Sequence, residues 1–439
     1  MSAYDAEYRS KLTTPETAVS KIASATNISM GMALGEPPAL LRALAARLKA
    51  GELKDLSLWY FHSMPAAGET VLRYENLERV RPHCMFLGLY ERELIKRGEK
   101  EGRKLVNFVP MAFSEAPRLL TERVEIDTFI TTVSPMDKHG WFTFGTNNDY
   151  ASTVAKSAKR LMVEVNRNMP RVFGDSFLHI SDVDIIVEND EPLFEVPIPP
   201  AQPQDEIIGR GIAEMVEDGA CLQMGIGALP NAVCTLLKDH QNLGIHTELL
   251  MPGFVDLLLS GAVTNRSKAT YPGRTVFTFA VGDRKLYDLL DDNPSMASLP
   301  VGIVNDPRHI AKNRKVVSVN ATLEVDLTGA CNSEHMMGRQ YSGSGGQLDF
   351  VRGAYASPGG KSIIACHSTA KGETLSRIVA ELKGPVTCPR NDTQYVMTEF
   401  GCVDLKGKSA SERAKALIGI AHPKFHGELT EAARKKMLI

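Results

Sequence analysis

Long apolar runs are missing from this sequence. No stretch of its 439 residues approaches the roughly 18 uncharged apolar residues that a membrane-spanning helix needs. The first residues, MSAYDAEYRSK, alternate in charge and contain no apolar segment, so they do not predict a secretory signal. Lys and Arg (50) almost balance Asp and Glu (52), which gives no electrostatic reason to expect nucleic acid or an anionic membrane as a partner. We therefore expect a globular protein of the cytoplasm.

Cysteine is scarce, and the common metal and nucleotide motifs are absent. The seven cysteines include no C-x-x-C pair, and an odd number in a long chain favours reduced thiols over a disulfide framework. The chain has no H-E-x-x-H motif and no clustered His, Cys and Asp, so no metal site is predicted. A P-loop and the G-x-S-x-G motif of α/β-hydrolases are also missing. We expect no tightly bound cofactor.

What the sequence does contain is an alternation of helix-like and strand-like segments. Residues 205–219 carry apolar side chains at helical spacing, and residues 220–224 form a short apolar run of strand length. After a glycine loop, residues 230–239 again have a helical pattern, and residues 243–248 resemble a strand. Strand, loop, helix and strand at this spacing predict an α/β protein with a parallel sheet.

A proline-rich segment divides the chain. Residues 195–204 contain four prolines, which oppose both helices and central strands. A chain of this length favours two domains over one. We therefore predict an N-terminal α/β domain over residues 1–195 and a C-terminal α/β domain over residues 205–439.

The first candidate site is the glycine loop Gln223-Met224-Gly225-Ile226-Gly227, which follows a predicted strand and precedes a predicted helix. Backbone amides in such a loop attract a phosphate or a developing oxyanion. The loop lacks the third glycine of the dinucleotide fingerprint, so a dehydrogenase is a weak alternative. A tight turn without a ligand remains equally compatible with the pattern.

The second candidate is Glu248, at the end of the predicted strand 243–248. In open α/β sheets, ligands bind beyond the carboxyl ends of the strands, where this carboxylate could act as nucleophile or base. A solvated or helix-capping role is the alternative. His246 is expected to be a half-buried strand residue. Glu399 is a rival carboxylate, for which we favour a capping role or an interface ion pair.

Two further glycine-rich segments, residues 342–347 and 357–361, lie in the C-terminal part. Glycines at this density lower local stability unless the backbone must approach a ligand. Ser368, Thr369 and Lys371 follow and offer hydroxyls and a cation, so a polyanionic ligand would fit. Flexible turns with a surface lysine are the alternative.

The order of these segments resembles the class I CoA-transferase superfamily, in particular the branch of 4-hydroxybutyrate CoA-transferases, butyryl-CoA:acetate CoA-transferases and acetyl-CoA hydrolases. Itaconate CoA-transferases are similar as well. The resemblance covers most of the chain from about residue 130, and residues 31–40 resemble the family's N-terminal Gly-Glu-Pro segment. It is carried by residues 165–184, 222–233 (LQMGIGALPNAV), 244–265, 320–329, 342–354 (SGSGGQLDFVRGA) and 395–425.

This resemblance implies two similar open α/β domains of the CoA-transferase (NagB/RpiA-like) type with the active site in the cleft between them. Glu248 would be the catalytic glutamate. Residues 223–227 would contact CoA and supply oxyanion amides, whereas Gly345, Gly346, Ser368 and Lys371 would hold CoA. Residues 31–38 and 146–151 would line the acyl pocket.

The implied activity is transfer of CoA between a short-chain acyl-CoA and a carboxylic acid, by ping-pong kinetics through a glutamyl-CoA thioester. CoA would be a substrate rather than a bound cofactor, and a homodimer is expected. The alternatives are an acyl-CoA hydrolase on the same scaffold and a non-catalytic sensor that binds CoA.

Overall fold

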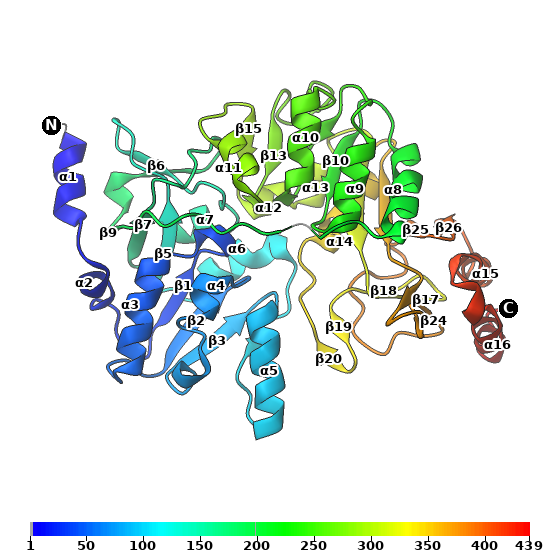
Figure 1. The fold of residues 1–439 in the computed structure, drawn as a ribbon, viewed down its shortest axis with the longest axis horizontal. Coiled ribbons are helices and arrows are strands. Elements are labelled where there is room, and N and C mark those ends of the chain that lie inside the picture. Colours follow the sequence, from blue (N-terminus) through cyan, green and yellow to red (C-terminus); the bar gives the residue numbers. More distant parts are fainter. Residues whose placement is uncertain (1–2, 198) are drawn as a thin grey trace. The chain divides into compact units, whose positions relative to one another are not determined.

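The structure, a computed structural model, describes residues 3–197 and 199–439 (Figure 1). The chain divides into two compact units. Unit 1 contains Met1–Val196 and Phe277–Ile303, and unit 2 contains Pro197–Val276 and Val304–Ile439. The described residues include no helix that is long and apolar enough to cross a membrane.

Unit 1 is built on a seven-stranded sheet in the order β4-β3-β2-β1-β5-β7-β9, and all of its strand pairs are parallel. All residues of its strands β5 and β7 are buried, as is usual for the central strands of a parallel sheet covered by helices, although β5 contains three threonines. The bounds are β1 Asn27–Met30, β2 Leu56–Tyr60, β3 Val80–Cys84, β4 Asn107–Phe108, β5 Thr128–Val133, β7 Leu161–Val165 and β9 Ile185–Glu188.

Helix α3 (Pro38–Lys49) shows why these residues fold as they do. It begins with Pro38, whose fixed φ suits a first helical position, and it buries Leu40, Leu41, Leu44 and Leu48 at helical spacing. These leucines join Ile28, Met30 and Leu58 of the sheet in one core. The other helices of residues 1–196 are α1 Ala3–Lys11, α2 Pro15–Val19, η1 Ala33–Gly35, α4 Pro65–Gly68, η2 Tyr74–Asn76, α5 Leu89–Glu101, η3 Phe113–Glu115, α6 Ala116–Arg118, η4 Leu119–Arg123, α7 Ala151–Ala155 and η5 Ile180–Asp182.

The segment 277–303 belongs to unit 1, although we expected it within the C-terminal domain. Its backbone bonds explain the difference: Asn148 Nδ2 donates to Ser298 O at 3.0 Å, and Val301 N donates to Asp149 O at 2.9 Å. The segment contains β14 Phe279–Ala280, α11 Arg284–Leu290 and β15 Met296–Ser298. The antiparallel pair β6 Trp141–Thr143 and β8 Phe177–His179 completes unit 1. β13 Thr275–Phe277 and α12 Val301–Val304 lie where the chain passes from one unit to the other.

Unit 2 is built on a six-stranded sheet in the order β11-β10-β16-β21-β25-β26, of which only the last pair is antiparallel. The bounds are β10 Cys221–Met224, β11 Gly244–Ile245, β16 Val316–Ala321, β21 Lys361–Ala365, β25 Tyr395–Thr398 and β26 Gly401–Asp404. The shorter strands are β12 Leu249–Leu250, β17 Glu324–Asp326, β18 Cys331–Asn332, β19 His335–Met336, β20 Arg339–Gln340, β22 Thr369–Ala370, β23 Leu375–Ser376 and β24 Ile378–Val379.

The helices of unit 2 include those that the sequence predicts. The expected helix 205–219 is α8 (Pro203–Met215), which ends earlier because Val216 has an extended backbone. The expected helix 230–239 is α9 (Ala228–Leu236), and the expected strand 220–224 is β10. The remaining helices are α10 Pro252–Ser260, α13 Pro307–Ile310, α14 Gln347–Ala356, α15 Ala410–Ile420, η6 Pro423–Phe425 and α16 His426–Lys435.

In each sheet the chain first adds strands on one side of the first strand and then continues on the other side, which defines a switch point. In unit 1 the chain runs from β1 through β2, β3 and β4 to one edge, and then continues on the other side of β1 with β5. In unit 2 it runs from β10 to β11 and then continues on the other side of β10 with β16. Such switch points, at the carboxyl ends of the strands, are where open α/β sheets bind ligands.

Candidate active site

Glu248 lies in unit 2, in the turn between β11 and β12. The sequence predicts that it closes a strand of six residues, but β11 ends at Ile245. The chain then leaves the sheet: His246 forms an isolated bridge with Val276, and Thr247 N donates to Val276 O at 3.0 Å. His246 is buried rather than half-buried, with 1% of its surface exposed. Glu248 is thereby placed on a loop that is held by backbone bonds on both sides.

Two groups hold the Glu248 carboxylate. Asn305 Nδ2 donates to Glu248 Oε2 at 2.6 Å, and the N–H of Gly346 also donates to the carboxylate. A larger residue at position 346 would displace the carboxylate, because a Cβ there would lie 1.9 Å from Glu248 Oε2. Gly345, with a φ of 56°, precedes it and leads into α14. Gly346 thus contacts the candidate nucleophile, a contact that the sequence did not predict.

The pKa of Glu248 is raised to about 7. Burial is the largest cause, and the nearby carboxylate of Asp349 raises the pKa further, whereas the bonds from Asn305 and Gly346 lower it. A pKa near neutrality leaves a large fraction of Glu248 ionised at pH 7. Such a weakly solvated carboxylate can act as a nucleophile or a base.

The glycine loop follows β10, the strand beside β11. Its first two residues point into the protein: Gln223 is bound by Ser318 Oγ at 2.6 Å and by Asn320 Nδ2 at 3.2 Å, and Met224 is 1% exposed. Gly225 N already donates to Val319 O at 3.3 Å.

Ile226 is the exposed residue of this loop, and Gly227 beside it is half-buried. Gly227 has a φ of 131°, a conformation that L side chains rarely adopt, and it precedes the first turn of α9. No hydrogen bond from the N–H of Ile226 or of Gly227 is found within the described part of the chain. These two amides are therefore candidates for binding a ligand, whereas the N–H of Gly225 has a partner in the protein; the role of residues 223–227 in CoA binding stays a prediction.

A pocket of about 240 Å³ opens at this switch point of unit 2. Arg377 and His367 lie in its wall; His367 Nε2 pairs with Asp205 Oδ1 at 2.8 Å, while Arg377 is anchored by bonds to the carbonyls of Thr369 and Leu323. Neither residue was a candidate, because neither stands in a recognisable motif. The lining includes Gly225, Ile226, Gly227, Asn320, His367 and Arg377.

Ser368 and Lys371, expected near CoA, do not line this pocket. Ser368 is fully buried, and its N–H and Oγ donate to the two oxygens of Glu399 at 2.8 and 2.6 Å. Glu399 therefore fixes the loop after β21, and an ion pair of Glu399 at an interface stays a prediction. Lys371 lies in the turn between β22 and β23, with Nζ 3.4 Å from Met337 Sδ. Their role in CoA binding stays a prediction.

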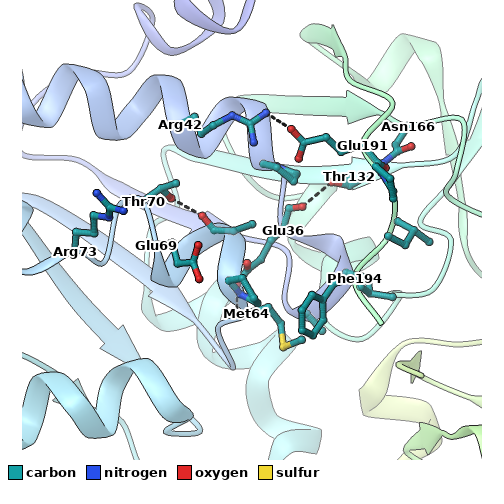
Figure 2. Close-up of a pocket in the computed structure, with 17 residues that line it drawn as sticks. Glu36, Arg42, Met64, Glu69, Thr70, Arg73, Thr132, Asn166, Glu191 and Phe194 are labelled. Atoms are coloured by element: carbon teal, nitrogen blue, oxygen red, sulfur yellow. Dashed lines mark hydrogen bonds and ion pairs between the residues drawn. The ribbon is translucent and has the colours of Figure 1, made fainter. Parts of the chain in front are cut away.

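Unit 1 has its own pocket of about 450 Å³, at the switch point between β1 and β5 (Figure 2). Glu36 lies at its centre, with Thr132 Oγ1 bound to the Glu36 carbonyl at 2.8 Å. The Glu36 carboxyl accepts bonds from Met64 N and Ala67 N at the start of α4, and burial raises its pKa well above the usual range. Two N–H groups at the start of α4 are thus used by Glu36 and are not free for a ligand.

The walls of this unit 1 pocket are largely apolar, and charged groups stand at its rim. Leu34, Met64 and Phe194 contribute to the walls, and Arg42 forms an ion pair with Glu191 (Figure 2). Residues 31–38, which the resemblance assigns to the acyl pocket, supply part of the lining. The apolar part of this lining fits the body of an organic acid better than a nucleotide.

The chemistry of the site depends on carboxylate and amide groups. Within residues 3–197 and 199–439, no group of three or more His, Cys, Asp and Glu side chains could hold a metal ion. The seven cysteines are unpaired, and six of them are buried.

Comparison with known proteins identifies the family. The model of the acetyl-CoA hydrolase/transferase N-terminal domain matches residues 1–198, and the model of the C-terminal domain matches residues 282–433. The chain is 46% identical to the succinyl-CoA:cyclohexane-1-carboxylate CoA transferase of Geobacter metallireducens, over 98% of this chain and 97% of that protein. It is 42% identical to the 4-hydroxybutyrate coenzyme A transferase of Clostridium kluyveri, over 98% of each.

Among solved structures, that of RipA from Yersinia pestis is 58% identical and matches with a TM-score of 0.98 over 100% of both chains. The chain therefore belongs to the acetyl-CoA hydrolase/transferase family. The predicted family and the predicted α/β fold class are confirmed. The dehydrogenase alternative is wrong, since this family is a different one.

Proposed function

We propose that the chain is a CoA-transferase that moves CoA from a short-chain acyl-CoA to a carboxylic acid through a covalent intermediate on Glu248. The observation that carries this proposal is the Glu248 carboxylate, which is partly ionised near pH 7 and held by Asn305 and Gly346. The names of its relatives support the reaction type.

The reaction starts when a Glu248 oxygen attacks the carbonyl carbon of the acyl-CoA. The tetrahedral intermediate collapses with loss of CoA thiolate and leaves a mixed anhydride. The thiolate then attacks the glutamyl carbonyl, which releases the first acid and forms a glutamyl-CoA thioester. The acceptor carboxylate attacks this thioester and expels the thiolate, which attacks the new acyl carbonyl and restores Glu248. No proton has to be gained or lost overall.

The oxyanion of the tetrahedral intermediate needs donors that are not already used. The N–H groups of Ile226 and Gly227 qualify, because Gly225 N is bound to Val319 O. One donor of this kind typically contributes about 3–4 kcal/mol to the transition state. We place both amides at the carbonyl oxygen of the thioester.

The names of the relatives and the lining of the unit 1 pocket support a proposal for the acid class. The relatives are named for succinyl-CoA, cyclohexane-1-carboxylate and 4-hydroxybutyrate. The apolar lining around Leu34 and Phe194 favours a small acid with a hydrocarbon body. Succinate, itaconate, butyrate, acetate and 4-hydroxybutyrate are the acceptors to compare first.

The decisive assay follows acyl-CoA loss and new thioester formation, with and without an acceptor acid. We expect ping-pong kinetics, slow hydrolysis without acceptor, and a loss of transfer of at least about 1000-fold in Glu248→Ala and Glu248→Asp. Near-native transfer by both variants would rule out the proposal. Turnover that needs no acceptor acid would instead identify an acyl-CoA hydrolase.

The CoA site is tested separately through Arg377. Its guanidinium has five N–H donors, and two carbonyls occupy only part of them, so the remainder can bind a CoA phosphate. We expect Arg377→Ala to raise the KM for acyl-CoA about 10-fold at a similar kcat. Arg352, which pairs with Asp392 on the surface, provides the matched control Arg352→Ala. An unchanged KM in Arg377→Ala would remove this residue from the CoA site.

A further inference from the structure

The strand that leads to Glu248 has an open edge. β11 pairs with β10 on one side only, and the bonds to β10 come from Gly244 N and His246 N, which donate to Ala220 O and Leu222 O. The N–H and C=O of Ile245 therefore point away from the sheet. On that side β11 is flanked by two isolated bridges, Leu243 to Val263 and His246 to Val276, rather than by a paired strand, and a buried backbone group without a partner is costly.

Two side chains bind the peptide groups of Ile245 between these bridges. Asn265 Oδ1 accepts a bond from Ile245 N at 2.8 Å, and Lys268 Nζ donates to Ile245 O at 2.7 Å. Lys268 Nζ also donates to Arg274 O at 2.7 Å, two residues before the Val276 carbonyl that holds Thr247. The side chains of residues 265–268 thus bridge β11 and the 274–276 segment.

Lys268 is an unusual choice for this position. It is 5% exposed, and the contacts of its ammonium within the described residues are two backbone carbonyls and no carboxylate. Burial lowers its pKa to about 8, which shows that the charge is costly here. A neutral side chain would fill the same space without this cost, so packing alone does not explain the ammonium.

The strand is shaped to fit this lysine. A Cβ on Gly244 would lie 2.7 Å from Lys268 Cγ, so the first residue of β11 leaves room for the lysine stem. Asn265 is 3% exposed and has a φ of 57°, and its Nδ2 is bound to Thr275 Oγ1 at 3.0 Å. Asn265 and the ammonium of Lys268 therefore both bind Ile245, which follows Gly244 and lies three residues before Glu248.

We infer that Lys268 is a positioning residue for the reaction: its ammonium fixes the Ile245 carbonyl, and with it the loop that presents Glu248 to Asn305 and Gly346. The inference rests on the proposed function, because it takes Glu248 as the nucleophile. Its chemical basis is that attack requires the reacting atoms to be held within a fraction of an ångström, and that a misplacement of about 1 Å can cost about 100-fold in rate.

The test compares Lys268→Met with Lys11→Met. Methionine keeps the stem and removes the donors. Lys11 is the matched control, because its Nζ also donates to a backbone carbonyl, Ile180 O at 2.7 Å, but at the end of α1 in unit 1. We expect Lys268→Met to lower kcat about 100-fold while the KM for acyl-CoA changes less than about 3-fold, and Lys11→Met to keep both near the wild-type values.

Gly244→Ala provides a second variant if Lys268→Met does not fold. Its methyl group pushes the lysine stem from the strand side, so we expect a loss of kcat of about 10-fold at an unchanged KM for acyl-CoA. Wild-type kcat in a folded Lys268→Met, or in Gly244→Ala, would overturn the inference. If Glu248→Ala itself keeps full activity, the proposed function has failed, which is a different result from an active Lys268→Met in an enzyme that needs Glu248.

Discussion

At the scale of single residues, opposing effects set the ionisation of Glu248. Burial and Asp349 disfavour the carboxylate, while Asn305 and the N–H of Gly346 stabilise it, and the result is a pKa of about 7. A fully solvated carboxylate would be ionised but weakly nucleophilic, and an unassisted buried one would be protonated. The Glu248 carboxylate lies between these limits, because it is buried and yet partly ionised near pH 7.

This balance predicts a pH dependence. The nucleophile must be ionised, so we expect kcat/KM for acyl-CoA to rise with pH and to level off above an apparent pKa of about 7. Asn305→Ala removes a bond to the ionised form, so the rising limb should move to higher pH. Asp349→Asn removes a neighbouring negative charge, so the limb should move to lower pH. The pH profiles of the three proteins measure both shifts.

The opposite signs make this test specific. A general loss of structure would lower the rate of both variants without moving their pH profiles in different directions. A flat profile between pH 5 and 9 in the wild type, or shifts of the same sign in both variants, would contradict the assignment of the limb to Glu248.

At the scale of elements, the site depends on a few loops that follow strands. Gly346 lies in the loop before α14, and Glu248 lies in the turn after β11. The two loops meet where the N–H of Gly346 donates to the Glu248 carboxylate. Gly346 has a φ of −97°, which any residue can adopt, so its constraint is space and not backbone conformation.

Gly346→Ala should therefore damage catalysis more than folding. Its Cβ would lie 1.9 Å from Glu248 Oε2 and 2.1 Å from Asn305 Nδ2, so the carboxylate must move. We expect a loss of kcat of at least about 100-fold with a nearly unchanged melting temperature. Gly419→Ala, in helix α15, is the control, since no atom lies within 4 Å of the position that a Cβ on Gly419 would take. Full activity in Gly346→Ala would show that this contact is not part of the reaction.

The elements were easier to predict from sequence than their ends. The apolar periodicities around 205–219 and 220–224 correctly indicated α8 and β10, because local spacing determines which face is buried. The strand before Glu248 was predicted too long, since His246 pairs with Val276, a partner 30 positions away that no local pattern reveals. Glu248 was singled out, but Asn305 was not: its importance comes from a tertiary contact without a motif.

At the scale of the whole molecule, the first stretch of unit 1 ends at Val196, and the chain later returns to that unit at residues 277–303, a return that the prolines of residues 195–204 do not reveal. Residues 277–303 contribute buried side chains there, among them Leu286, Leu290 and Leu299. Their backbone partners, such as Asn148 and Asp149, lie more than 100 positions earlier in the chain. Composition and periodicity carry no information about such pairings.

This return predicts how fragments behave. A fragment of residues 205–439 carries the 277–303 segment without its partners, so apolar side chains that unit 1 buries would face water. We expect it to aggregate or to unfold without cooperativity, whereas the full chain melts cooperatively. Circular dichroism melting and light scattering measure this difference. A monomeric fragment 205–439 with a cooperative transition would contradict the division of the chain into these two units.

Glu248 as the covalent carrier of CoA is tested most directly by chemical trapping. The protein is incubated with acyl-CoA, reduced with borohydride and digested, and the peptide that contains residue 248 is analysed by mass spectrometry. A glutamyl-CoA thioester at this position is reduced to the corresponding alcohol, so we predict this change only when acyl-CoA is present. An unmodified Glu248 in a protein that still transfers CoA would contradict the mechanism.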